Sequence, residues 1–151
     1  MAQITPFQGM RFTGKAGKIE QLVCPPYDII SNEQRLEYLR QNEHNVIRLE
    51  LPREGEDPYT EAGRVLNGWL RDAILREEDK DSLYVYEEEF EHRGQKLCIR
   101  GVICRVKLEE FEKGVVLPHE ETLSKAKQDR FQLMQATGCN FSQIYSLYID
   151  D

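Results

Sequence analysis

Apolar residues recur every three or four positions in parts of this chain, which predicts three main helices. Ser31 and Gln34 have the spacing of a capping box at the start of the first helix. Pro58 suits the first turn of the second helix, which has the clearest apolar stripe. Gly138 is placed to cap the end of the third. The helices predicted in this way span residues 31–42, 57–74 and 124–137.

In other segments apolar and polar residues alternate, which predicts strands. In the run NVIRLEL, the side chains of Ile47, Leu49 and Leu51 would point to one side, as in a half-buried strand. Two longer runs flank His92, Arg93 and Gly94 and predict an antiparallel hairpin. The predicted strands span residues 4–12, 45–51, 83–90, 96–108, 115–117 and 144–149.

These elements predict an α+β fold: a single domain over residues 1–151, with a mixed, mostly antiparallel sheet of about five to six strands and three main helices. A net charge of −7 argues against duplex nucleic acid as a partner, because phosphate backbones are bound by clustered Lys and Arg. No apolar run is long enough to cross a membrane, and the N-terminus lacks a secretory pattern, so we expect a cytoplasmic protein. The abrupt C-terminus suggests the N-terminal fragment of a longer protein.

Four cysteines occur without the close pairs typical of zinc sites. We therefore expect reduced thiols and no metal site among Cys24, Cys98, Cys104 and Cys139.

The richest segment for chemistry is residues 115–149, where an apolar run, a polar turn, a helix and a second apolar run follow one another. Lys125 and Lys127 lie near the start of the predicted helix and Arg130 follows within two turns. Cations there oppose the helix dipole unless an anion is bound. The alternative is that these cations form a solvent-exposed helix face that offsets the negative charge of the chain. We expect these three residues and Thr122 to bind phosphate.

The polar turn before this helix contains His119 and Glu120, which are candidates for proton transfer. They do not open a zinc-protease HExxH motif, because position 123 is leucine. An exposed or capping histidine is the alternative. A third candidate catalytic residue is Asp28, which follows the rigid Pro25-Pro26 pair. We expect the turn 118–122 and the loop 25–28 to line one cleft.

Three segments, CPPYDII, NVIRLELP and PHEETLSKAKQDR, together resemble the N-terminal part of a prokaryotic family catalogued as domain of unknown function 1015. The resemblance covers essentially the whole chain but implies no activity. The order strand, polar turn, helix, strand in residues 115–149 is more distantly similar to the ParB-like nucleotide-binding superfamily, which includes sulfiredoxin. In that superfamily a phosphate-binding motif opens the helix, but here no glycine precedes His119 and no arginine is adjacent to it.

We therefore expect a site for a small phosphate-bearing ligand, most simply a nucleotide with Mg²⁺. Glu120 or Asp28 would act as a base or help to hold the metal ion. Small-molecule phosphoryl transfer or nucleotide hydrolysis is the reaction that such a site would support. The rival hypothesis is a non-catalytic interaction or regulatory module that uses its sheet edge and hairpin. The C-terminal remainder of the parent protein is a further expected partner.

Overall fold

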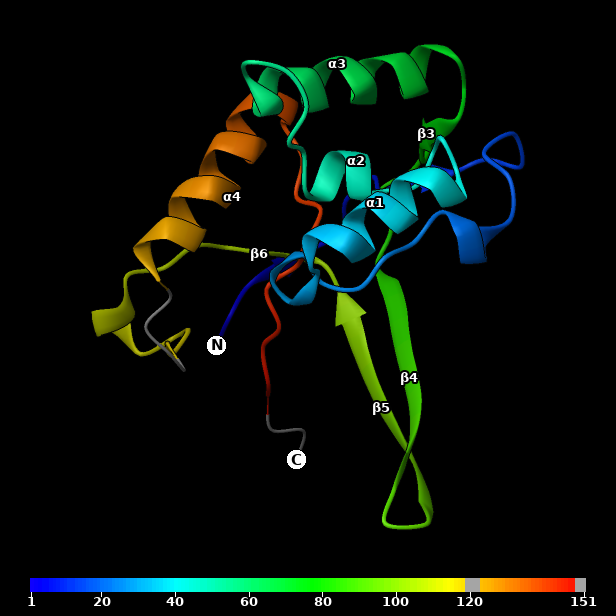
Figure 1. Ribbon diagram of the computed structural model, residues 1–151. Coiled ribbons are helices and arrows are strands. Elements are labelled where there is room, and N and C mark those ends of the chain that lie inside the picture. The colour runs from blue at the N-terminus through cyan, green and yellow to red at the C-terminus, as the bar shows by residue number, and fades with distance from the viewer. Residues whose placement is uncertain (119–122, 149–151) are drawn as a thin grey trace. The chain divides into compact units, whose positions relative to one another are not determined.

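The computed structural model describes residues 1–118 and 123–148, in which the chain forms two compact units (Figure 1). The helical unit comprises residues 12–76 and 122–151, and the hairpin unit comprises residues 1–11 and 77–121. The predicted α+β class is confirmed, with three main helices and short antiparallel sheets.

The α-helices of the described residues all belong to the helical unit: α1 (Asn32–Gln41), α2 (Ile47–Glu50), α3 (Pro58–Arg71) and α4 (Ser124–Thr137). The same unit has two short 3₁₀ helices, η1 (Ile19–Gln21) and η2 (Tyr27–Ile29). The predicted capping box is present at α1, where the Ser31 hydroxyl accepts from the Gln34 N–H and the Gln34 side chain accepts from the Ser31 N–H. The three predicted long helices are thus confirmed.

The core of the helical unit forms where α2 and α3 meet the segments on either side of them. Trp69 of α3 is only 7% exposed and packs against Phe12 and His44, at ring-centroid distances of 5.9 and 5.7 Å. The remaining buried members of this cluster are Ala16, Leu22, Leu49, Leu66, Ile74 and Leu75. Apolar burial of this kind is the main source of stability in a small domain.

The strand predicted over residues 45–51 is wrong, because Ile47–Glu50 is the short helix α2. Asn45 explains the difference: its side-chain oxygen accepts a hydrogen bond from the Ile47 N–H at 3.0 Å. Such a local bond stabilises a turn in place of an extended strand. The alternating apolar residues still reach the interior, with Ile47 0% and Leu49 1% exposed.

The described strands form three two-stranded sheets instead of one sheet of five or six strands. In the hairpin unit, β1 (Ile4–Thr5) pairs with β6 (Arg105–Val106), and β4 (Tyr84–His92) pairs with β5 (Gln95–Ile103). The third sheet joins β2 (Met10–Phe12) to β3 (Leu75–Glu77), the two segments by which the chain passes between the units. The hairpin unit also contains a 3₁₀ helix, η3 (Phe111–Lys113).

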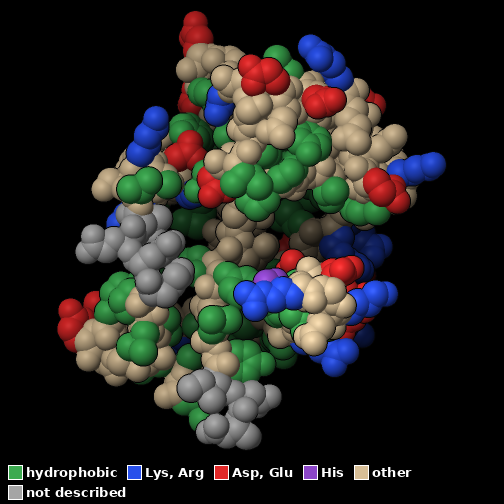
Figure 2. All heavy atoms as spheres, turned by 60° about the horizontal axis from the view of Figure 1, so that its bottom comes forward, with side chains coloured by type: hydrophobic (Ala, Val, Ile, Leu, Met, Phe, Trp, Pro, Cys, Tyr) green, Lys and Arg blue, Asp and Glu red, His purple; other side chains and the backbone are tan. Residues whose placement is uncertain are grey.

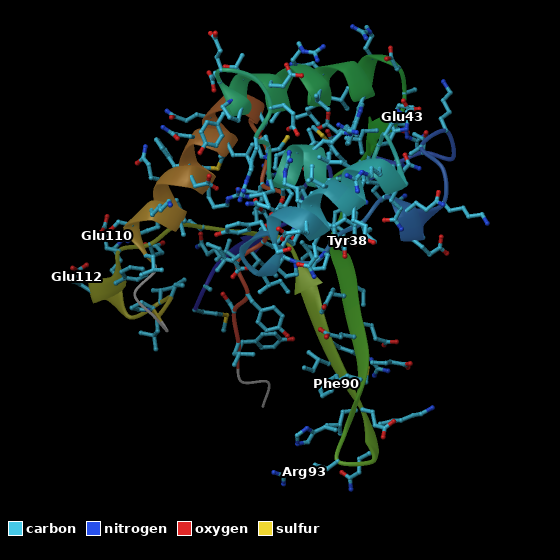
Figure 3. All side chains as sticks on the ribbon, viewed as in Figure 1. Tyr38, Glu43, Phe90, Arg93, Glu110 and Glu112 are labelled. Atoms are coloured by element: carbon cyan, nitrogen blue, oxygen red, sulfur yellow. The ribbon has the colours of Figure 1, made fainter. Side chains whose placement is uncertain are left out.

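The predicted hairpin is confirmed and turns through two residues, Arg93 and Gly94. Their φ angles are +52° and +75°, which is the combination that a type I′ turn requires. Glycine suits the second position because it has no Cβ to clash. Figure 3 shows Arg93 at this turn and Phe90 shortly before it on β4.

The strands predicted at 115–117 and 144–149 are not found in the described residues. The side chains of Ile144 and Leu147 are each 89% exposed, and neither segment pairs with another strand in the described part of the chain. Alternation gives a strand only where a partner strand satisfies the backbone groups. Of the order strand, turn, helix, strand predicted for residues 115–149, only the helix is found in the described residues.

Candidate functional site

Helix α4 carries three of the predicted ligand-binding residues, and its packing on α3 fixes its position within the helical unit. The Tyr59 hydroxyl of α3 donates to Asp129 Oδ1 of α4 at 2.8 Å. Further along α4, the Leu133 side chain is 2% exposed. The two helices approach closely beside Gly63, where a Cβ atom would lie 2.7 Å from the Ala136 carbonyl oxygen. The second to fourth turns of α4 are therefore held against α3.

Arg130 lies where α4 meets α2 and η2. Its Nε donates to Asp129 Oδ2 at 2.9 Å, and its Nη1 donates to Glu50 Oε1 at 3.3 Å. The guanidinium carbon stands 3.9 Å from the centre of the Tyr27 ring, which is a cation–π contact. The Arg130 side chain is 22% exposed, so these contacts are partly shielded from water.

Glu50 is the most deeply buried charge of this cluster, with its side chain 7% exposed. Besides Arg130, it accepts a hydrogen bond from the Ser142 hydroxyl. A buried carboxylate needs such partners, because desolvation without them costs several kcal/mol. Burial, together with the negative charge of Glu50, raises the pKa of the Cys24 thiol to about 11. Burial, with help from its bond to Asp129, likewise raises the pKa of Tyr59.

Asn45 positions the chain that leads to Tyr27. Its side chain is fully buried, and its Nδ2 donates to the carbonyl oxygens of Gln21 at 2.9 Å and Val23 at 3.1 Å. The Val46 N–H adds a bond to the Leu22 carbonyl at 2.8 Å. Asn45 and Val46, the first residues of the NVIRLELP motif, thus fix the backbone of residues 21–23, which leads into the CPPYDII motif.

The three motifs that carry the family resemblance therefore meet at one cluster. CPPYDII supplies Tyr27, NVIRLELP supplies Glu50, and the helical end of PHEETLSKAKQDR supplies Asp129 and Arg130. Because two carboxylates flank one guanidinium, the charge of Arg130 is already compensated. Lys125 and Lys127, in contrast, are exposed on the first turns of α4.

The other predicted site residues divide into two groups. Asp28 lies on η2 next to Tyr27 and is exposed. His119, Glu120 and Thr122 lie outside the described residues, and the cleft predicted between residues 118–122 and 25–28 stays a prediction for the same reason. Within the described residues, the contact of Tyr27 with Arg130 joins the loop 25–28 to helix α4.

Sequence reasoning missed the roles of Tyr27, Glu50, Tyr59 and Ser142. Strand alternation over residues 45–51 would place Glu50 on the outer side, whereas the turn at Asn45 directs it inward. The available signal was its place in an apolar run, where a buried charge requires a cationic partner elsewhere in the chain. Nothing in the pattern around Ser142 indicates that its hydroxyl meets Glu50.

The four cysteines are free thiols. Within residues 1–118 and 123–148, no three His, Cys, Asp or Glu side chains are grouped so as to hold a metal ion. None of the described helices combines the length and the apolar character needed to span a bilayer.

Fold and cluster together define an α+β protein in which motifs distant in the sequence converge on a partly buried ion-pair network. The chain belongs to the family described as "Protein of unknown function (DUF1015)", whose model matches residues 4–151. Comparisons with curated proteins and with solved structures gave no match.

Proposed function

We propose that the helical unit binds a phosphate-bearing ligand, most simply a nucleotide, at the first turns of α4. The observation that carries the proposal is the unusual start of this helix. Among the described residues α4 has no side-chain cap and no acidic residue in its first turn, where Lys125 lies, and Lys127 follows. Both lysine side chains are exposed.

The other two long helices begin in the opposite way. The Ser31 hydroxyl caps α1, which carries Glu33 in its first turn, while the Asp57 carboxylate caps α3, which carries Glu61. Oxygen atoms at these positions satisfy the unpaired N–H groups and favour the positive end of the dipole. In α4 a phosphate would supply the same oxygens, and the lysines would add charge-assisted hydrogen bonds.

The contacts of Arg130 with Asp129, Glu50 and Tyr27 would hold α4, and with it the proposed site, in a fixed position. Because Glu50 and Asp129 already compensate its charge, Arg130 would orient the helix, and Lys125 and Lys127 would carry most of the phosphate binding. The contact with Tyr27 brings η2, and with it Asp28, toward the same helix. Mg²⁺ would arrive with the nucleotide, held by phosphate oxygens and one carboxylate such as Asp28 or Glu120.

Phosphoryl transfer or nucleotide hydrolysis is the reaction that this donor set would serve, with Asp28, Glu120 or His119 as candidates for proton transfer. The likeness to the ParB and sulfiredoxin superfamily adds no support, because its flanking strands are not found in the described residues.

Calorimetric titration tests the proposal directly, using ATP, ADP and inorganic phosphate with and without Mg²⁺. The test variant is Lys125→Ala/Lys127→Ala. The matched control is Lys18→Ala/Lys80→Ala, which removes two exposed lysines elsewhere. Loss of charge-assisted bonds of about 1.5–3 kcal/mol should weaken binding at least tenfold in the test variant and less than twofold in the control.

Absence of binding by the wild type at millimolar concentration would show that the proposal is wrong. If both double variants bound the ligand equally weakly, binding would reflect general electrostatic attraction and not a site at α4. Arg130→Ala is a poor test, because it would leave the buried Glu50 carboxylate without its cation. A thermal-shift series gives an independent readout, since a ligand that binds the native state raises the melting temperature.

A further inference from the structure

Glu50 differs from the other carboxylates of the chain because it is buried. Figure 2 shows Asp, Glu, Lys and Arg side chains standing out at the surface, whereas Glu50 is the one buried carboxylate among the described residues. Its bond to Arg130 gives it a structural part in the proposed ligand site. A carboxylate held in place in this way can also act as a base for a hydroxyl group that bonds to it.

Ser142 supplies such a hydroxyl group. It lies four residues after Gly138, which caps α4, and its hydroxyl donates to Glu50 Oε1. Ser142 is exposed, so a reactant in solvent can approach its Oγ atom. Glu50 is oriented in turn by Arg130, whose Nη1 donates to the same carboxylate oxygen at 3.3 Å. A hydroxyl, a base within hydrogen-bond reach and a third group that orients the base are the parts of an activated nucleophile.

Ser31 offers a comparison within the same unit. Its hydroxyl donates to Glu33 Oε2 at 2.9 Å, but Glu33 is exposed. Water therefore competes for the oxygen atoms of Glu33 and leaves that pair without a fixed geometry. Burial of Glu50 excludes most of this competition and keeps its Oε1 atom on Ser142.

We propose that Ser142 is a nucleophile that accepts a phosphoryl group, with Glu50 as its general base. In this step Ser142 Oγ attacks phosphorus while the hydroxyl proton passes to Glu50 Oε1. The new P–Oγ bond forms as the bond from phosphorus to the leaving group breaks, and the leaving group keeps the electron pair of that bond. With a nucleoside triphosphate as the donor, the terminal phosphoryl group moves to Ser142 and the nucleoside diphosphate leaves.

The identity of this donor rests on the proposed function. Arg130, which contacts Glu50, lies three residues after Lys127, so the two side chains are neighbours on the surface of α4. A terminal phosphate held by Lys127 would thus lie toward Arg130 and the Glu50–Ser142 pair. Cys24 is the other nucleophile near Glu50, but burial and the charge of Glu50 raise the pKa of its thiol to about 11, so it reacts poorly.

A fluorophosphonate reagent tests the activation of Ser142 without any nucleotide, because an activated serine displaces its fluoride. Ser146, four residues further along, is also exposed and is an internal control, since in the described residues Glu50 bonds Ser142 and not Ser146. Ser31 is a second control. General bases contribute factors of about 10² to 10⁴, so Ser142 should be labelled at least about tenfold faster than either control. Peptide mass spectrometry assigns the label to each serine.

Glu50→Gln should slow the labelling of Ser142 to the rate at Ser146, because an amide accepts the hydrogen bond but not the proton. Glu33→Gln is the matched variant and should leave the rate at Ser142 unchanged. Equal labelling of Ser142 and Ser146 in the wild type would overturn the proposal, and this comparison needs no variant to fold. A Glu50→Gln protein that keeps the wild-type circular dichroism spectrum and the wild-type rate at Ser142 would overturn it as well.

Incubation with ATP and Mg²⁺ then tests the donor. Ser142 should gain one phosphoryl group in the wild type and in Ser146→Ala, whereas Ser142→Ala and Glu50→Gln should gain none. If ATP binds in the calorimetric titration but Ser142 stays unmodified, transfer to Ser142 is disproved while the ligand site stands. If ATP does not bind, the proposed function is wrong, and the fluorophosphonate rates still decide whether Glu50 activates Ser142.

Discussion

The helical unit and the hairpin unit are stabilised in different ways. Every buried hydrophobic residue among those described lies in the helical unit, from Ala16 to Leu133. The hairpin unit relies on backbone pairing between β4 and β5 and between β1 and β6, and its large apolar side chains stay partly exposed. An isolated two-stranded hairpin is only marginally stable in water.

This difference bears on the proposed function. The packed helical unit can hold side chains in fixed geometry, as the Arg130 network illustrates, and that is what a ligand site requires. The hairpin unit exposes apolar side chains such as Val85 and Leu97 and has no buried apolar residue among those described. The proposed ligand site thus rests on the packed unit of the two.

The largest expected effect comes from removing the centre of the helical core. Trp69→Ala should lower the free energy of unfolding by about 3–5 kcal/mol, because it removes a buried ring that packs on Phe12 and His44. Leu97→Ala on the exposed hairpin should cost less than about 1 kcal/mol. Urea unfolding followed by circular dichroism measures both. If both substitutions lowered the free energy of unfolding equally, the two units would not differ in how they are stabilised.

A second prediction compares the same substitution at two places on α3. Gly63→Ala should destabilise the helical unit by about 1–3 kcal/mol, since the new Cβ would lie 2.7 Å from the Ala136 carbonyl oxygen of α4. At Gly68 the nearest atom is 3.9 Å away, at the end of the Arg71 side chain. Gly68→Ala should therefore stabilise by up to about 1 kcal/mol through helix propensity.

Thermal and urea unfolding of the two single variants give the sign of each change. If Gly63→Ala were neutral, the close approach of α3 and α4 would not contribute to packing, and the support of the Arg130 network by α3 would be weakened. A destabilising Gly68→Ala would instead point to an undescribed contact on the outer face of α3.

Local signals allowed much of the fold to be predicted. The capping box at Ser31, the Asp57-Pro58 start and Gly138 each act within one helical turn, so their effects are visible in a short window of sequence. The hairpin was equally clear, because its alternation and its Arg93-Gly94 turn are local.

What could not be predicted depends on partners that are far apart in the sequence. The strand assigned to residues 45–51 was wrong because Asn45 is held in a turn, and its side chain is fixed there by the distant carbonyl oxygens of Gln21 and Val23. The Arg130 cluster joins residues separated by up to about 100 positions, and no pattern in a single sequence identifies such pairs. The predicted residues Asp28 and Arg130 lie on η2 and α4, whereas the contacts of Glu50, Tyr59 and Ser142 with this cluster were not predicted.

The smallest expected effect compares one thiol in each unit. Cys24 is half-buried near Glu50, and its pKa is raised to about 11, first by burial and then by the negative charge of Glu50. At pH 8 only about one Cys24 thiol in a thousand would be ionised, so it should react slowly with a disulfide reagent such as DTNB. Cys98 on β5 is exposed and should react faster.

Single-cysteine variants that retain Cys24 or Cys98 separate the two rates. Because the folded-state pKa of the Cys24 thiol lies above its ordinary value, folding disfavours the thiolate, so its contribution to stability is present below about pH 9 and declines as the pH approaches 11. The DTNB rate at Cys24 should accordingly rise steeply between pH 8 and 10. Replacing Glu50 by Gln should increase that rate at pH 8, since the nearby negative charge is removed, while the rate at Cys98 stays constant. An unchanged rate at Cys24 in this variant would show that burial alone, and not Glu50, suppresses its ionisation.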